Sequence, residues 1–240
     1  MPAASARLPV VVVTCKVLAS ALERLLPPDL AEDVTLLEYG LHRAPAKLTA
    51  SVQEALDAIQ VPSLVILGYG LCGNGLRGIR SGAHTLLVPR TDDCIAILLG
   101  SYKAYMRHFS AEPGTYWLTK GWLEAGSHPL KEYQEYTARW GADEALWLLD
   151  QQYRNYKRIA LVAPNLEEMA QYRASAQEVA RFCERWGYRY EEVLGSDDYV
   201  TRLIEAAVAL RDGAPAASTG PDFLVIPPAA EIKQEMFMRG

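Results

Sequence analysis

The apolar and polar positions along the chain predict strands that alternate with helices. Four short apolar runs, rich in β-branched residues and ended by proline, glycine or polar positions, are typical of strands. They cover residues 9–14, 34–39, 63–69 and 84–89. Later stretches predict helices, among them 95–109 and the amphipathic segment 166–186. Because this alternation favours a parallel sheet with right-handed crossovers, we expect an α/β fold: a mostly parallel sheet with helices on both faces, in Rossmann-like halves.

A helical, aromatic stretch separates two groups of predicted strands. Residues 131–156 are helix-forming, and Gly141 within them indicates two helices rather than one. Beyond this stretch, apolar runs predict further strands at 158–164, 188–195 and 223–228. We therefore expect three parts, which are an N-terminal α/β half over 1–125, a helical connection over 126–157 and a C-terminal α/β half over 158–240.

Composition and charge narrow the classes of function. The chain has 240 residues, half of them apolar, so it can bury a full core without disulfides. Its formal net charge is −5 with both signs mixed throughout, which leaves no electrostatic footprint for nucleic acid or an anionic membrane. The first residues lack the apolar segment of a signal peptide or membrane span. We expect a cytoplasmic protein, whose cysteines more often bind metals or act in catalysis than form disulfides.

Three cysteines and one histidine follow the four N-terminal strands. Cys15, His42, Cys72 and Cys94 each come just after a predicted strand. Since the carboxyl ends of parallel strands meet at one edge of a sheet, where ligands bind, we expect the four side chains to be neighbours. Thiolate and imidazole are the ligands that zinc prefers. The sequence therefore predicts one metal centre at that edge, held by the three cysteines, with His42 as a candidate fourth ligand.

Two general properties of cysteine bear on this prediction. A thiolate is stabilised near a helix N-terminus, which is where Cys94 and Cys15 are expected to lie. A single free cysteine, however, is more often a small buried hydrophobe. We interpret Cys183, in the middle of the amphipathic segment, as such a core residue. It is the placement of three cysteines at strand ends that favours a shared site.

The predicted ligands fit two kinds of metal centre. Tetrahedral zinc is satisfied by three thiolates and an imidazole. A [4Fe-4S] cluster is normally held by four cysteines, so three would leave one iron open to bind substrate. A coordinating His42 favours zinc, and His42 outside the coordination sphere favours the cluster, so both centres stay open on the sequence alone.

The loop around Cys72 offers candidates for cofactor binding. Its sequence, GYGLCGNG over residues 68–75, holds too many glycines to continue as strand or helix. Such a loop lets the backbone pass close to a metal or a ligand. The candidate cofactor-binding residues are Gly70, Gly73 and Asn74.

Three further side chains are candidates for catalysis, namely Tyr69, Arg90 and Asp93. Arg90 can hold a substrate carboxylate or phosphate, or it can pair with Asp92 or Asp93. Asp93 can also accept a hydrogen bond behind a metal ligand. Either aspartate can cap the helix that begins near Cys94.

Several motifs, in the same order along the chain, resemble one known family. They are GYGLCGNGL over 68–76, PR and DCI within 89–95, LLGS over 98–101, PGTY over 113–116, and LT with GW over 118–122. Leu41-His42, followed by Pro45 and Leu48, also resembles its pattern. The family is the domain-of-unknown-function family 1638 of bacteria and archaea. Its members are often encoded near corrinoid-dependent methyltransferase components, so the resemblance implies methyl or one-carbon transfer and a corrinoid protein or methyltransferase as partner.

We expect a cytoplasmic metalloenzyme that acts on a small molecule, with methyl or one-carbon transfer as the implied reaction, through the three-cysteine centre. The alternative is a non-catalytic metal or corrinoid accessory protein for a methyltransferase system, which a closed four-ligand site would favour. In a third interpretation the cysteines are plain core and the protein is a metal-free binding domain. The apolar residues at 236–238 are compatible with a homodimer.

Overall fold

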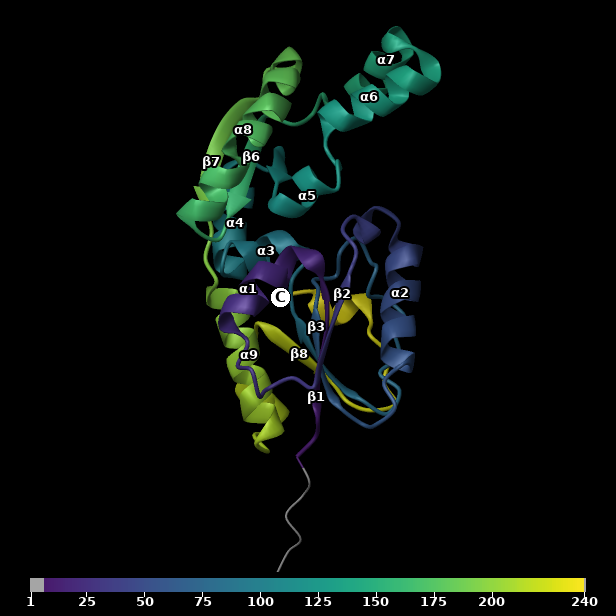
Figure 1. Ribbon diagram of the computed structural model, residues 1–240, viewed down its shortest axis with the longest axis vertical. Helices are drawn as coiled ribbons and strands as arrows, with labels where there is room; N and C mark the ends of the chain where they lie inside the picture. The colour runs from purple at the N-terminus through teal and green to yellow at the C-terminus, as the bar shows by residue number, and fades with distance from the viewer. Residues whose placement is uncertain (1–6, 240) are drawn as a thin grey trace, which may run out of the picture. The chain divides into compact units, whose positions relative to one another are not determined.

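The structure, a computed structural model, describes residues 7–239 (Figure 1). The described residues form two compact units. The first unit combines the chain up to Ile97 with the chain from Asp197 onward, and the second holds Leu98–Ser196.

This division differs from the expected halves. Residues 197–239, which we expected in a C-terminal half, belong to the same unit as the N-terminal strands. The reason is that the last strand pairs with a strand of the N-terminal sheet. Apolar periodicity identifies a strand, but it does not identify the strand with which it pairs.

The first unit is built on a five-stranded sheet with the order β2-β1-β3-β4-β8. Its strands are β1 (Val10–Cys15), β2 (Asp33–Leu37), β3 (Leu64–Gly68), β4 (Thr85–Pro89) and β8 (Phe223–Ile226). The first four strands are parallel, and β8 is antiparallel to β4. Strands β1 and β3 are buried along nearly their whole length, as expected for a parallel sheet covered on both faces. The carboxyl ends of four strands therefore lie at one edge.

Helices cover both faces of this sheet, with α2 on one side and α1 and α9 on the other (Figure 1). The helices of the unit are α1 (Ala19–Leu25), α2 (Pro45–Asp57), α3 (Cys94–Leu98) and α9 (Asp198–Arg211), with short 3₁₀ turns at Lys16–Leu18, Leu41–Arg43, Ala216–Thr219 and Gln234–Phe237. Helix α2 presents Leu48, Val52 and Leu56, one residue per turn, to a core that includes Val11 and Val13. The predicted α/β fold is confirmed.

The second unit holds a parallel three-stranded sheet with the order β5-β6-β7. Its elements are α4 (Tyr102–Ala111), β5 (Thr115–Leu118), α5 (Lys120–Glu124), α6 (Pro129–Trp140), α7 (Ala142–Tyr153), β6 (Arg158–Ala163), α8 (Leu166–Cys183), a 3₁₀ turn at Glu184–Trp186 and β7 (Arg189–Leu194). Helix α8 packs on β6 and β7. Asn165 caps α8 by accepting a hydrogen bond from the Glu168 N–H, and Cys183 at its end is fully buried, as the sequence predicted.

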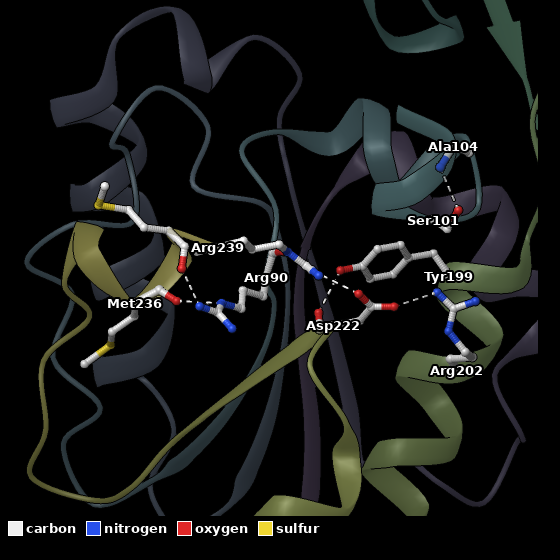
Figure 2. A network of polar contacts seen from close by, with 9 residues as sticks. Arg90, Ser101, Ala104, Tyr199, Arg202, Asp222, Met236 and Arg239 are labelled. Atoms are coloured by element: carbon white, nitrogen blue, oxygen red, sulfur yellow. Dashed lines mark hydrogen bonds and ion pairs between the residues drawn. The ribbon is translucent and has the colours of Figure 1, made fainter. Parts of the chain in front are cut away.

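Glycines end the helices in two places. Gly141, with φ +92°, separates α6 from α7, as predicted. The predicted single helix over 95–109 is instead two, because Gly100 adopts φ +81° and ends the first. Ser101 then caps α4 by accepting a hydrogen bond of 3.0 Å from the Ala104 N–H (Figure 2).

None of the helices within residues 7–239 combines the length and the apolar character needed to cross a membrane.

Candidate metal-binding site

The three N-terminal cysteines lie at the carboxyl edge of the first sheet. Cys15 ends β1, Cys72 is in the loop after β3, and Cys94 begins α3 after β4. Since β3 pairs with both β1 and β4, these three strand ends are neighbours. Cys72 and Cys94 are buried and Cys15 is half-buried. The placement that the sequence predicted for the cysteines is thus the one that the structure has.

Two loops that carry cysteines are joined through their backbones. The Leu71 N–H donates to the Thr91 carbonyl oxygen and the Cys72 N–H to the Asp92 carbonyl oxygen, each at 2.8 Å. Gly70 permits this approach, because a Cβ at that position would lie 2.9 Å from backbone atoms of Asp93. Gly70 therefore acts by letting the Cys72 loop and the Cys94 loop come together.

The backbone around Cys72 is strained. Cys72, Gly73 and Asn74 adopt φ values of +48°, +65° and +71° in succession. Residues other than glycine rarely take this left-handed conformation, and each such residue costs about 1–2 kcal/mol. Such strain tends to be retained at functional sites, where the surrounding structure holds it. A functional need for the Cys72 thiol at this position would explain why the protein retains this backbone strain.

The three thiols lie within electrostatic range of one another. Burial is the main cause that raises the pKa of Cys72, followed by Asp93 and Cys15. Burial raises the pKa of Cys94 well above its ordinary value, with Cys72, Asp93 and Cys15 adding to the effect. Cys94 begins α3 and Cys15 precedes the 3₁₀ turn Lys16–Leu18, so both lie near a helix start as expected, but burial has the larger effect and raises the pKa of both thiols. Burial thus favours the neutral form of all three thiols.

Backbone N–H groups oppose the effect of burial on the thiols. The N–H groups of Gly70 and Cys94 lower the pKa of Cys72, and the Val17 N–H lowers the pKa of Cys15, although burial has the larger effect on both. These donors favour the thiolate form. A bound cation would also favour the thiolate form and would outweigh the effect of burial, since metal-bound thiols are deprotonated.

Tyr69 is buried beside the cysteines. It is 4% exposed and belongs to the same hydrophobic cluster as Cys72, with Cys15 packed against that cluster. Burial and then the charges of Cys15, Cys72 and Cys94 raise the pKa of Tyr69. Its hydroxyl is buried and has no hydrogen-bond partner among residues 7–239. The structure therefore brings this candidate together with all three cysteines.

Asp93 is held next to the thiols by its role at the start of α3. Its Oδ1 accepts a hydrogen bond of 2.9 Å from the Ile95 N–H, so Asp93 is the predicted cap of this helix. Burial raises the pKa of Asp93 to about 6. Asp93 in turn raises the pKa of both Cys72 and Cys94, which places its carboxyl group close to them.

His42 lies in the 3₁₀ turn Leu41–Arg43. Its backbone carbonyl oxygen is 3.9 Å from the place that a Cβ on Gly73 would occupy. Burial lowers the pKa of His42, with a further contribution from Arg43, whereas the strongest charged partners of the buried thiols are the other cysteines and Asp93. The structure thus brings the His42 backbone to the glycine loop.

Arg90 contacts the C-terminal segment rather than Asp92 or Asp93 (Figure 2). Its Nε donates to the Met236 carbonyl oxygen at 2.8 Å, and its Nη2 donates to the Met238 carbonyl oxygen. These contacts occupy the side chain that we expected to bind a substrate anion. They indicate a structural role for Arg90.

Asp222 anchors the same segment through contacts that sequence reasoning missed (Figure 2). Its carboxylate binds Arg239 at 3.0 Å and Arg202 at 3.3 Å, and its carbonyl oxygen accepts from the Tyr199 hydroxyl at 2.7 Å and from the Arg90 N–H at 2.8 Å. No local sequence signal marks these partners, because residues far apart in the chain supply them.

The three thiols lie at neighbouring strand ends, but they are not arranged as the ligands of a metal ion. Within the part of the chain that the structure describes, no group of three or more His, Cys, Asp or Glu side chains is arranged so as to hold a metal ion. What the structure gives is the position of the three cysteines at one sheet edge and their burial.

Comparisons with known proteins give one family. The family model described as "Protein of unknown function (DUF1638)" matches residues 36–204, which include Cys72 and Cys94. No curated protein and no solved structure matches the chain. The match covers well over half of the sequence and agrees with the resemblance of its motifs, so this chain belongs to the DUF1638 family.

Proposed function

We propose that this protein binds one metal centre through Cys15, Cys72 and Cys94 and uses it to act on a small molecule. The observation that carries the proposal is that three largely buried thiols lie at three neighbouring strand ends, at one edge of the sheet. Soft thiolate ligands select zinc or iron–sulfur clusters. The fold class adds support, because parallel sheets bind ligands at this edge.

Two observations favour this proposal over a plain cysteine core. A core cysteine needs no left-handed backbone, yet Cys72 adopts φ +48°. A plain core also has no use for the Tyr69 hydroxyl, which is buried without a partner in the described residues. Both features become useful if a polar or charged group binds among the three thiols.

Either zinc or a [4Fe-4S] cluster is compatible with three thiolates, and either one leaves a position for a substrate atom, which it would polarise. The residues of the chain have separate tasks around such a centre. The N–H groups of Gly70 and Cys94 stabilise negative charge on Cys72. The apolar cluster that includes Tyr69 and Leu71 limits the access of water.

Methyl transfer is the reaction that we propose for this centre. A zinc ion held by Cys15, Cys72 and Cys94 would make a substrate thiol a better nucleophile toward a methyl group. A corrinoid protein or methyltransferase partner belongs to this proposal. Transfer of a methyl group from methylcobalamin to a thiol would form a methyl thioether and release cob(I)alamin and a proton, and the change in cobalamin absorbance would test this reaction once the metal is known.

Substitution of Cys72 by serine tests the metal centre. We expect Cys72→Ser, purified without oxygen, to lose its zinc or iron, because two thiolates do not hold either centre well. Cys183→Ser is the matched control, since Cys183 is also buried but lies in the second unit, at the end of α8. The measurement is elemental analysis with a visible spectrum. Equal metal content in Cys72→Ser and the unmodified protein would contradict the proposal.

A further inference from the structure

The Tyr69 hydroxyl differs from the other buried tyrosine hydroxyls of this protein. Tyr199 donates to the Asp222 carbonyl oxygen and Tyr153 donates to the Glu132 carboxylate, each at 2.7 Å. Tyr69, with 4% of its surface exposed, has no such partner in residues 7–239. Native proteins rarely bury a hydroxyl in this way, because the group loses its bond to water and gains none in return.

Tyr69 lies in an apolar cluster that also holds one of the cysteines and contacts a second. Tyr69 shares a hydrophobic cluster with Leu71 and Cys72, and Cys15 packs against that cluster. A second buried hydroxyl without a partner in the described residues belongs to Thr91, whose carbonyl oxygen accepts a hydrogen bond from the Leu71 N–H. Two hydroxyl donors are therefore buried on segments that adjoin the cysteine loops, and an acceptor for them is lacking.

We infer that the Tyr69 hydroxyl donates a hydrogen bond to the donor atom of a small anionic ligand, a thiolate or an oxyanion, that completes the centre held by Cys15, Cys72 and Cys94. This inference rests on the proposed function. Three thiolates leave one position on a tetrahedral metal. The atom that fills it carries negative charge, and in an apolar enclosure a phenol is a strong donor to such an atom.

The inference assigns Tyr69 to the bound ligand and not to the metal itself. A tyrosine that coordinated the metal would have to lose its proton, and burial next to three thiols opposes that loss. As a neutral donor, Tyr69 contributes to ligand affinity and selectivity, and the cysteines alone account for metal affinity. These two contributions can be measured separately.

Cobalt-substituted protein gives a direct readout of the ligand position. Purified protein is stripped, loaded with Co(II) and titrated with 2-mercaptoethanol in one series and with acetate in another, and the cobalt absorption is followed. The probe that binds identifies the ligand as a thiolate or an oxyanion. We expect Tyr69→Phe to keep its cobalt and to raise the Kd of that probe at least about tenfold, which is the effect of losing a hydrogen bond to a charged group.

Tyr199→Phe is the matched control, because it removes a buried hydroxyl of the same unit that already has a partner. Its Kd should be unchanged. An unchanged Kd in Tyr69→Phe, or loss of cobalt from that variant, would overturn this inference alone. If the unmodified protein bound neither cobalt nor an iron–sulfur cluster, the proposed function would fail and the inference with it. For a protein that carries a cluster, the same titration follows the visible spectrum of the cluster.

Discussion

At the scale of single residues, two tyrosines of the first unit bury their hydroxyl groups under opposite conditions. Tyr199 is fully buried and its hydroxyl is bonded to Asp222, whereas Tyr69 lies in an apolar cluster with Cys72 and its hydroxyl is buried without a bond in the described residues. The first arrangement stabilises the fold. The second arrangement lowers the stability of the fold. A protein retains such a buried, unbonded hydroxyl where a ligand bonds to it.

Tyr-to-Phe substitutions at the two positions should therefore differ in their effect on stability, and only the substitution at Tyr199 should lower it. With chelator present, Tyr69→Phe should leave the free energy of unfolding unchanged or raise it by about 1 kcal/mol, because an unpaired polar group is removed. Tyr199→Phe should lower it by about 1 kcal/mol, because the Asp222 carbonyl oxygen loses a donor. Urea unfolding of both variants measures the difference. A loss of stability in Tyr69→Phe as large as that in Tyr199→Phe would contradict the account of Tyr69.

The sequence predicted which residues follow the ends of the strands. It did not predict which distant residues their side chains contact. Cys15, Cys72 and Cys94 follow continuous apolar runs, so their place at the sheet edge could be read from the sequence. The contacts of Arg90 with Met236 and Met238 could not, because they join positions more than 140 apart. From the neighbouring sequence, the only protein partners that we could suggest for Arg90 were Asp92 and Asp93.

At the scale of elements, the boundaries of helices depend on single capping groups. The sequence predicted one helix over 95–109 because its composition is helix-forming throughout, but Gly100 and the Ser101 cap divide it. In the second unit His128 caps α6, since its Nδ1 accepts a hydrogen bond of 3.2 Å from the Lys131 N–H. A ring nitrogen can cap a helix only while it is unprotonated.

The cap at His128 predicts a pH dependence of stability. Burial lowers the pKa of His128 from its ordinary value near 6.5. The unfolded chain therefore takes up the proton first as the pH falls, so the stabilisation is fully present above about pH 6.5 and is lost between that pH and the lower folded pKa. We expect a loss of about 1 kcal/mol, the usual contribution of such a cap.

An asparagine at this position gives the control. His128→Asn should keep the cap, because an amide oxygen also accepts the N–H bond, but it should remove this part of the pH dependence. Urea unfolding of both proteins at pH 7.5 and pH 5.5 provides the comparison. The same pH dependence in both proteins would show that His128 is not its source.

At the scale of the whole molecule, the chain leaves the first unit after Ile97 and returns to it at Asp197. The predicted boundaries at 126 and 158 followed changes in composition along the chain, and such changes do not show which sheet a later strand joins. Strand β8 pairs with β4, and the segment after it is bound by Arg90, which follows β4. The sequence therefore predicted the parallel sheet and the edge at which the cysteines lie. It did not predict that residues 197–239 join the first unit.

X-ray absorption at the metal edge, on protein purified without oxygen, tests the central claim most directly. Zinc and iron centres held by thiolates both have sulfur neighbours at about 2.3 Å. The account predicts such a sulfur shell in the unmodified protein and in Cys183→Ser, and its loss in a variant with Cys15, Cys72 and Cys94 all changed to serine. A protein without metal, or a metal with only nitrogen and oxygen neighbours, would contradict it.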